Sequence, residues 1–197
     1  MQIISQLMTA YTQVDQQIGK FQLKSGLRCL TGCGQCCPDA PVHVTMVEMF
    51  PAANEILLRG EGNLWIERIQ ALTEKSTCIF YSWKPAPDMP GHCTFYTWRP
   101  MVCRLFGFAA IRNRNGRKIL SICKVLKEQK PMEAAAAVAL QNEAPTFSEA
   151  SGLIYEIEPG LGTRLLPINT ALVKAIMALG LRIQIQQSES LGNNTAA

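Results

Sequence analysis

The stretch Cys29-Leu30-Thr31-Gly32-Cys33-Gly34-Gln35-Cys36-Cys37-Pro38 places four of the chain's eight cysteines within nine residues. A thiolate is a soft, negatively charged ligand, and Gly32 and Gly34 allow the backbone to curl until several sulfurs face one centre. The other four cysteines follow downstream and could complete one or two metal centres. The candidate metal ligands are therefore all eight: Cys29, Cys33, Cys36, Cys37, Cys78, Cys93, Cys103 and Cys123.

Length and composition indicate one domain. The chain has 197 residues and is 48% hydrophobic, enough to bury a core. We expect a domain over 1–183, with its core at 29–123, and a disordered tail over 184–197. The N-terminus lacks a basic or long apolar leader, and the longest aliphatic run, 134–140, is too short to span a bilayer. We therefore expect a cytoplasmic protein, whose reducing surroundings favour metal thiolates over disulfides.

Charge is unevenly distributed. The chain carries a net charge of +4, and nine of its basic residues lie between Arg99 and Lys130 against one acid, Glu128. Aromatic residues do not interleave with the basic residues at 112–118, as a single-strand binder would require. The sequence favours a solvated basic turn there, and nucleic acid is not an expected partner.

Apolar periodicity and capping signals predict a mainly helical α+β domain. Helices are expected over 2–23, from Met46, and over 64–72, 131–142, 145–157 and 170–179, the last capped by Asn169 and ended by Gly180. Segments 106–111 and 118–123 flank Asn115-Gly116, a hairpin signal. β-prone pieces at 78–81 and 93–96 flank a Pro-rich loop, and a short helix after Pro100 carries Cys103. Irregular cysteine-bearing segments would meet at a metal, packed by helices from both ends of the chain.

The ligand spacing narrows the choice of metal. Radical enzymes share the three-cysteine spacing, but no repeated strand-helix barrel is evident. Only Cys33-x-x-Cys36 is a zinc knuckle, so ribbon-type fingers fit poorly. The Cys37-Pro38 ending and the adjacent pair Cys36-Cys37, whose side chains diverge, favour a polynuclear iron-sulfur site. The sequence thus predicts an iron-sulfur protein with a protein or redox partner; a structural zinc module and a metal-dependent enzyme stay open.

These motifs resemble the YkgJ-like cysteine-cluster family, also described as the CxxCxxCC zinc- or iron-chelating domain. The matching pieces are Gly32-Cys33-Gly-Gln-Cys36-Cys37, Glu48, Cys78-Ile-Phe, Cys93-Thr-Phe-Tyr96 and Arg99-Pro-Met-Val-Cys103-Arg104. The resemblance implies a metal-chelating fold holding iron-sulfur or zinc. A flagellin lysine methylase family carries a similar cluster, which keeps methyl transfer among the alternatives. The chain departs from the family pattern in two places: three residues separate Cys29 from Cys33 where the family name implies two, and the loop over 82–91 is long.

Other polar residues have two interpretations each. His43 and His92 are favoured as surface imidazoles over ligands, and Glu48 as a helix cap over a partner of the cluster region. Arg99 and Arg104 flank Cys103, where their charge could offset that of the thiolates or bind an anion. No catalytic residue is identified.

Overall fold

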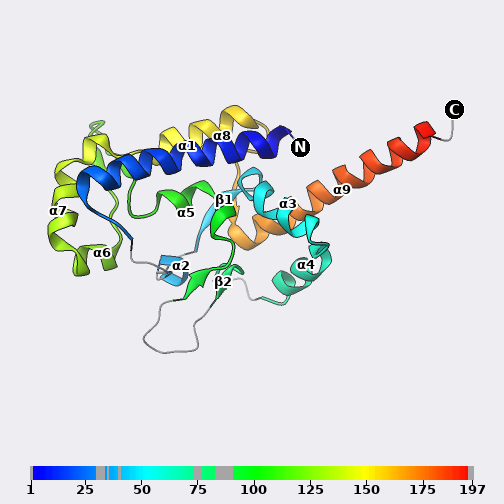
Figure 1. Cartoon of the computed structure of the whole chain (residues 1–197), viewed down its shortest axis with the longest axis horizontal. Helices are drawn as coiled ribbons and strands as arrows, with labels where there is room; N and C mark the ends of the chain where they lie inside the picture. Colours follow the sequence, from blue (N-terminus) through cyan, green and yellow to red (C-terminus); the bar gives the residue numbers. More distant parts are fainter. Residues whose placement is uncertain are drawn as a thin grey trace.

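The computed structural model describes residues 2–29, 34, 36–39, 41–72, 77–82 and 91–194. The Pro-rich loop at 84–90 and the segment 30–33 lie outside them. Helix α1 (Gln2–Ser25) packs against α5 (Met101–Leu105), α7 (Pro131–Ala139) and α8 (Phe147–Ile157), as Figure 1 shows. Its buried side chains repeat at helical spacing, the stripe that the sequence predicts: Leu7, Tyr11, Val14, Ile18 and Phe21. Gly26 follows with φ of +72°, a left-handed conformation that ends the helix.

Three helices form a second group: α9 (Ile168–Asn194) packs against α3 (Phe50–Leu58) and α4 (Gly62–Gln70). Fully buried alanines of α3 and α9 allow this close approach: Ala52, Ala53, Ala171 and Ala175. The far half of α9 extends away from the body (Figure 1). The prediction that Gly180 ends this helix is wrong, because the helix continues to Asn194, past Gln184, where the sequence predicts a disordered tail.

Gly180 serves packing rather than capping. A Cβ added there would lie 4.0 Å from Leu57 Cδ2, so the small residue faces α3. By length and composition, Ile168–Ile185 could cross a membrane, although no uninterrupted aliphatic run marks it. A third of this stretch, 33%, is buried inside the protein, where α9 packs on α3 and α4.

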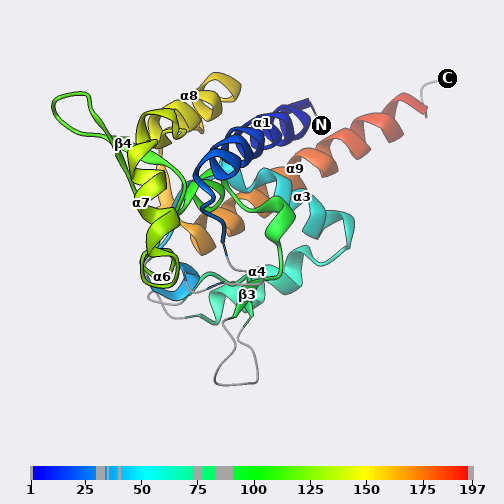
Figure 2. The ribbon, with the colours of Figure 1, turned by 60° about the vertical axis from the view of Figure 1, so that its left-hand side comes forward.

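Short antiparallel strand pairs complete the fold. Strand β1 (His43–Thr45) pairs with β6 (Leu165–Pro167), with Val44 opposite Leu166. Strand β2 (Tyr81–Ser82) pairs with β3 (His92–Cys93). Strands β4 (Ala110–Arg112) and β5 (Lys118–Leu120) form the predicted hairpin, which projects beside α7 and α8 (Figure 2). The mainly helical α+β class is confirmed.

The remaining helices are short. They are α2 (Cys36–Asp39), α5 (Met101–Leu105), α6 (Lys124–Gln129), α7 (Pro131–Ala139) and α8 (Phe147–Ile157), with 3-10 turns η1 (Val47–Met49), η2 (Tyr96–Trp98) and η3 (Gln141–Glu143). Proline occupies the first turn of α7 and of α3, where its missing N–H costs no hydrogen bond. Helix α6 was not predicted, because its six residues are too few to show a periodic pattern.

Candidate metal centre

Cys78 and Cys93 lie close together at the β2–β3 pair. Cys93 in β3 is directly opposite Tyr81 in β2. The Tyr81 N–H donates to the Cys78 carbonyl at 2.9 Å, and this hydrogen bond closes a turn that leads from Cys78 into β2. Burial, together with the negative charge of Cys93, raises the pKa of Cys78 to about 12. Without a cation the Cys78 thiol therefore keeps its proton, and a bound metal ion would reverse that balance.

The cysteine-rich turn reaches the same strand pair through Gly34. A Cβ added at Gly34 would overlap the carbonyl oxygen of Gly91 and lie 3.0 Å from the Cα of His92. The Cys37 N–H donates to the Gly34 carbonyl at 3.0 Å, which closes the turn at the start of α2. Residue 34 must therefore be glycine for the turn to rest against the backbone that leads into Cys93.

Gly91 is a second position where backbone and side chain meet closely. A Cβ added there would overlap the phenol of Tyr81 and lie 2.5 Å from the carbonyl oxygen of Ser82. The Gly91 N–H donates to the Tyr81 hydroxyl at 3.1 Å. The two glycines thus allow the cysteine-rich turn, β3 and β2 to stack within van der Waals distance.

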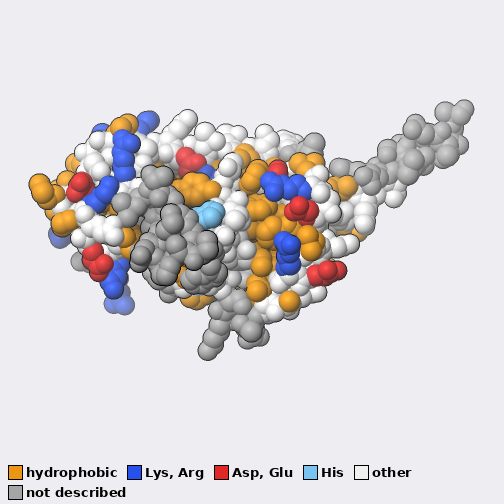
Figure 3. Space-filling view, turned by 60° about the horizontal axis from the view of Figure 1, so that its bottom comes forward, with side chains coloured by type: hydrophobic (Ala, Val, Ile, Leu, Met, Phe, Trp, Pro, Cys, Tyr) orange, Lys and Arg blue, Asp and Glu red, His pale blue; other side chains and the backbone are white. Residues whose placement is uncertain are grey.

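An aromatic cluster lies behind the two cysteines, since Phe80 and Phe95 each follow a cysteine by two residues. Their rings stack with centroids 4.3 Å apart, and Trp65 of α4 meets both edge-on at 5.3 Å. Trp98 packs on Phe95 at 5.4 Å, and Arg59 covers these two rings. In Figure 3, hydrophobic side chains interspersed with charged ones lie beside the grey atoms. The cluster gives the Cys78 and Cys93 segments a rigid, water-poor backing.

Asn169 fastens the Cys78 segment to α9. Its Oδ1 accepts from the Ile79 N–H at 2.9 Å, and its Nδ2 donates to the Thr77 carbonyl at 3.1 Å. The sequence predicts Asn169 as the cap of the last helix, but α9 begins one residue earlier and the side chain bridges the backbone on both sides of Cys78. This structural role was missed because the partner segment lies 90 residues away in the chain.

Glu48 holds the helix that carries Cys103. Its Oε2 accepts from the Thr45 N–H at 2.8 Å, while the Glu48 N–H donates to the Thr45 hydroxyl at 3.4 Å, so the predicted capping box forms. Its Oε1 accepts from the Met101 N–H at 3.2 Å, at the start of α5. Burial raises the pKa of Glu48 in spite of these hydrogen bonds. Glu48 is thus both a cap and a link to the Cys103 segment.

Arg104, next to Cys103, is 6% exposed and fully engaged. Its guanidinium forms an ion pair with Asp15 of α1 and donates to the carbonyls of Thr97 and Arg99. Burial lowers the pKa of Arg104, and the Asp15 carboxylate opposes that shift. The hydrogen-bonding groups of this guanidinium are therefore committed to fixing α1 against α5.

Fewer contacts are described for the other candidate ligands. Cys29 is exposed after α1, and Cys123 precedes α6, 3.5 Å from the position a Cβ would take at Gly107. Cys33 and the side chain of Cys36 lie outside the described part of the structure. Among the side chains described, no three His, Cys, Asp or Glu residues form a metal-binding group. The eight-cysteine ligand set stays a prediction, while His43 and His92 are exposed.

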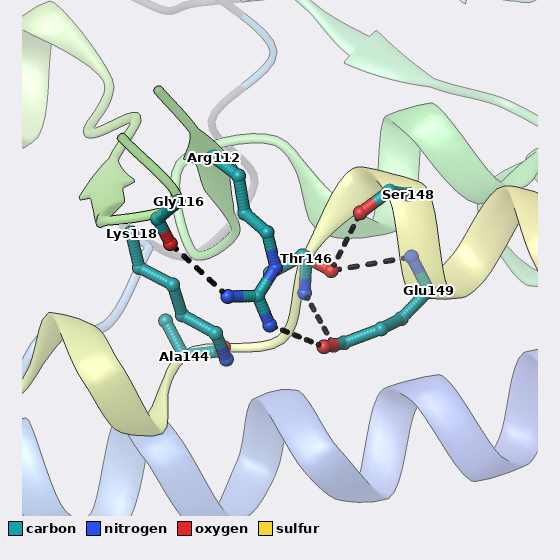
Figure 4. A network of polar contacts seen from close by, with 7 residues as sticks. All are labelled: Arg112, Gly116, Lys118, Ala144, Thr146, Ser148 and Glu149. Atoms are coloured by element: carbon teal, nitrogen blue, oxygen red, sulfur yellow. Dashed lines mark hydrogen bonds and ion pairs between the residues drawn. The ribbon is translucent and has the colours of Figure 1, made fainter. Parts of the chain in front are cut away.

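The basic hairpin supports α8, as Figure 4 shows. Arg112 donates to the Gly116 carbonyl and to Glu149, each at 3.3 Å, and Lys118 donates to the Ala144 carbonyl at 2.7 Å. Thr146 and Glu149 form the capping box of α8. Partial burial would raise the pKa of Glu149, but hydrogen bonds from Thr146 and the charge of Lys118 outweigh it and lower the pKa. Two of the basic residues thus have structural partners.

A cysteine-rich turn that rests through Gly34 on the strand pair of Cys78 and Cys93 defines a thiolate metal-binding module. The donors fit a soft or borderline metal such as zinc or iron, because thiolate sulfur is the ligand these metals take in cysteine-rich sites. Residues 28–124 match the model of the CxxCxxCC family, whose description is "putative zinc- or iron-chelating domain". The chain carries this domain, and the resemblance seen in its motifs is confirmed. No curated protein and no solved structure gave a significant match.

Proposed function

We propose that this protein holds an iron-sulfur cluster and passes electrons to a protein partner in the cytoplasm. The observation that supports this best is the adjacency of Cys36 and Cys37 in a turn that rests against the strand carrying Cys93. Neighbouring side chains diverge, so the pair suits a centre with more than one metal atom. The residues that would hold the cluster are Cys33, Cys36, Cys37, Cys78, Cys93 and Cys103, with Cys29 and Cys123 as further candidates.

The cluster would supply one-electron chemistry, and the chain would set the conditions for it. The aromatic cluster of Trp65, Phe80 and Phe95 keeps water away from the sulfurs, and solvent exposure is one of the factors that set the potential of such centres. Asn169 and Glu48 hold the Cys78 and Cys103 segments by backbone hydrogen bonds. These contacts limit movement of the ligands between redox states.

Anaerobic purification tests the proposal directly. We expect a brown protein with visible charge-transfer absorption that bleaches on reduction, and with iron and acid-labile sulfide in about equal amounts. The Cys78→Ser and Cys93→Ser variants should lose this absorption. A colourless protein that holds stoichiometric zinc, and that takes up no cluster when iron and sulfide are supplied under reducing conditions, overturns the proposal.

A structural zinc site is the second candidate, favoured by the knuckle Cys33-x-x-Cys36. Zn²⁺ has a filled d shell and gives no visible absorption, and a structural zinc site contributes folding free energy, so this function predicts a colourless protein that unfolds when a chelator removes zinc. Cobalt substitution would show the absorption of a tetrahedral thiolate site. Elemental analysis of one preparation decides between the two candidates.

A further inference from the structure

A hollow of about 430 Å³ opens between α1 and the segment that leads into α5. This volume is within the range of small-molecule sites. The residues lining it come from two elements far apart in sequence: Met8, Tyr11, Thr12 and Asp15 from α1, and Tyr96, Thr97, Arg99 and Arg104 from the η2–α5 segment. The hollow is built mainly from side chains that the metal centre does not use.

Two guanidinium groups and one carboxylate meet in this hollow. Arg104 is almost completely buried and is paired with Asp15, with its plane 4.5 Å above the Tyr11 ring. The Tyr11 hydroxyl donates to the Glu48 carbonyl, so it is not available to balance charge. One positive charge, that of Arg99, is therefore left over among the groups that line the hollow.

Arg99 is held in place but lacks a polar partner in the described part of the structure. The Cζ atom of its guanidinium lies 3.7 Å from the centroid of the Tyr96 ring, a cation–π contact that holds the group in place. Its Nε is buried and has no hydrogen-bond partner there. No carboxylate of the described residues lies within 4.0 Å of Arg99. The Nε atom has almost no accessible surface, so a ligand in the hollow would meet the terminal nitrogens of the guanidinium instead.

The acceptor that fits is an oxyanion. The edge formed by the two terminal nitrogens of a planar guanidinium takes two oxygens of a carboxylate or of a phosphate side by side. The charge left over is +1, and Met8 and the Tyr96 ring provide apolar surface for the remainder of a small ligand. We propose that this hollow is a binding site for a small carboxylate- or phosphate-bearing molecule, anchored by the guanidinium of Arg99. This site is independent of the metal chemistry proposed above.

The test follows the Arg99 Nε–H signal by nuclear magnetic resonance on the full-length protein in its metal-loaded form. Sodium phosphate and sodium acetate are titrated separately at constant ionic strength. We expect saturable movement of that one resonance with at least one anion. Saturation by phosphate alone identifies a phosphoryl ligand, and saturation by acetate alone identifies a carboxylate.

Variants separate anchoring from general charge effects. Arg99→Gln should weaken binding about tenfold or more, because it removes a charge-assisted pair of hydrogen bonds. Arg114→Gln removes the same charge from the exposed hairpin tip and should leave binding unchanged. Arg99→Lys keeps the charge but not the planar edge, and should also bind several-fold more weakly.

Metal content is measured on the same samples, so failure of this proposal is distinct from failure of the proposed function. Arg99→Gln should retain its metal. Saturable binding that Arg99→Gln and Arg114→Gln weaken equally overturns the proposal, as does a signal that moves linearly with both salts. Should Arg99→Gln fold poorly, the folded Arg99→Lys variant decides: affinity equal to the parent protein's overturns the proposal.

Discussion

Replacing Asn169 by alanine should loosen the Cys78 segment and weaken the metal centre together. The amide makes two hydrogen bonds, accepting from Ile79 and donating to Thr77, in part-buried surroundings. Each bond contributes about 1 kcal/mol net, and a donor left without a partner adds its desolvation cost, so we expect a loss of about 2–3 kcal/mol in the free energy of unfolding. Orienting contacts of this kind change metal affinity by roughly 10–100-fold, and we expect a loss in that range.

Urea denaturation measures the free energy, and competition with a chromophoric chelator measures the metal affinity. Hydrogen exchange at the Ile79 amide reports the local contact, and its protection should fall in Asn169→Ala. The matched control is Asn63→Ala, at an exposed position of α4, which should change none of the three. If Asn169→Ala keeps both its stability within about 0.5 kcal/mol and the protection of Ile79, the bridging role assigned to this amide is wrong.

Three further predictions concern the aromatic cluster, the ligands and pH. Phe95→Ala, which empties the centre of the cluster, should cost about 3–5 kcal/mol by urea denaturation, whereas Phe106→Ala at a largely exposed ring should cost less than about 1 kcal/mol; equal losses would contradict the packing described. Cys36→Ser should lose metal and lower Tm sharply, since thiolate binding contributes on the order of 10 kcal/mol, while Cys123→Ser should cost on the order of 1 kcal/mol; metal retained in the first and lost in the second would refute that ligand assignment. Burial raises the pKa of Glu48 above 4.5, so the folded state holds this proton to higher pH than the unfolded state. The stability that Glu48 contributes should therefore fall as pH rises from about 4.5 through the raised pKa, and parallel urea titrations should show the deficit of Glu48→Gln shrinking over that window; a deficit that grows with pH would contradict it.

Local patterns predicted local structure well. The apolar stripe of α1, the Asn115-Gly116 hairpin and the Thr45–Glu48 capping box depend on contacts within a few residues, and each is present. The capping box could not indicate that the second oxygen of Glu48 reaches Met101, because that contact requires α5 to pack beside η1.

Signals that have more than one use were misjudged. Gly180 reads as a helix stop, yet α9 continues through it where the helix packs on α3 beside Leu57. Asn169 reads as a cap, but its amide bridges a segment 90 residues away. In both cases packing against another element outweighs the local preference, and one sequence alone does not reveal that neighbour.

For the candidate site, the sequence supplied the chemistry and the structure supplied part of the geometry. Eight cysteines, four of them within nine residues, indicate thiolate binding, and the spacing of the motifs located the domain that the family match confirms. The sequence did not show that Cys78 and Cys93 lie together, because their proximity depends on the pairing of β2 with β3 and on the close packing of Gly91 against Tyr81. Nor did it separate the two arginines around Cys103, whose side chains have different surroundings.

The bridge from Asn169 to the Cys78 segment also sets an order of events during protein synthesis. A ribosome that adds 5–20 residues per second reaches Asn169 roughly 5 to 20 s after Ile79, since 90 residues separate them. During that interval every cysteine of the domain has been or is being made, while the helix that secures Cys78 does not yet exist. Metal delivered to the nascent chain would bind thiols before Asn169 holds the Cys78 segment in place. Metal delivered after release would bind a site in which that contact can already form. Insertion after release is the route that this arrangement favours.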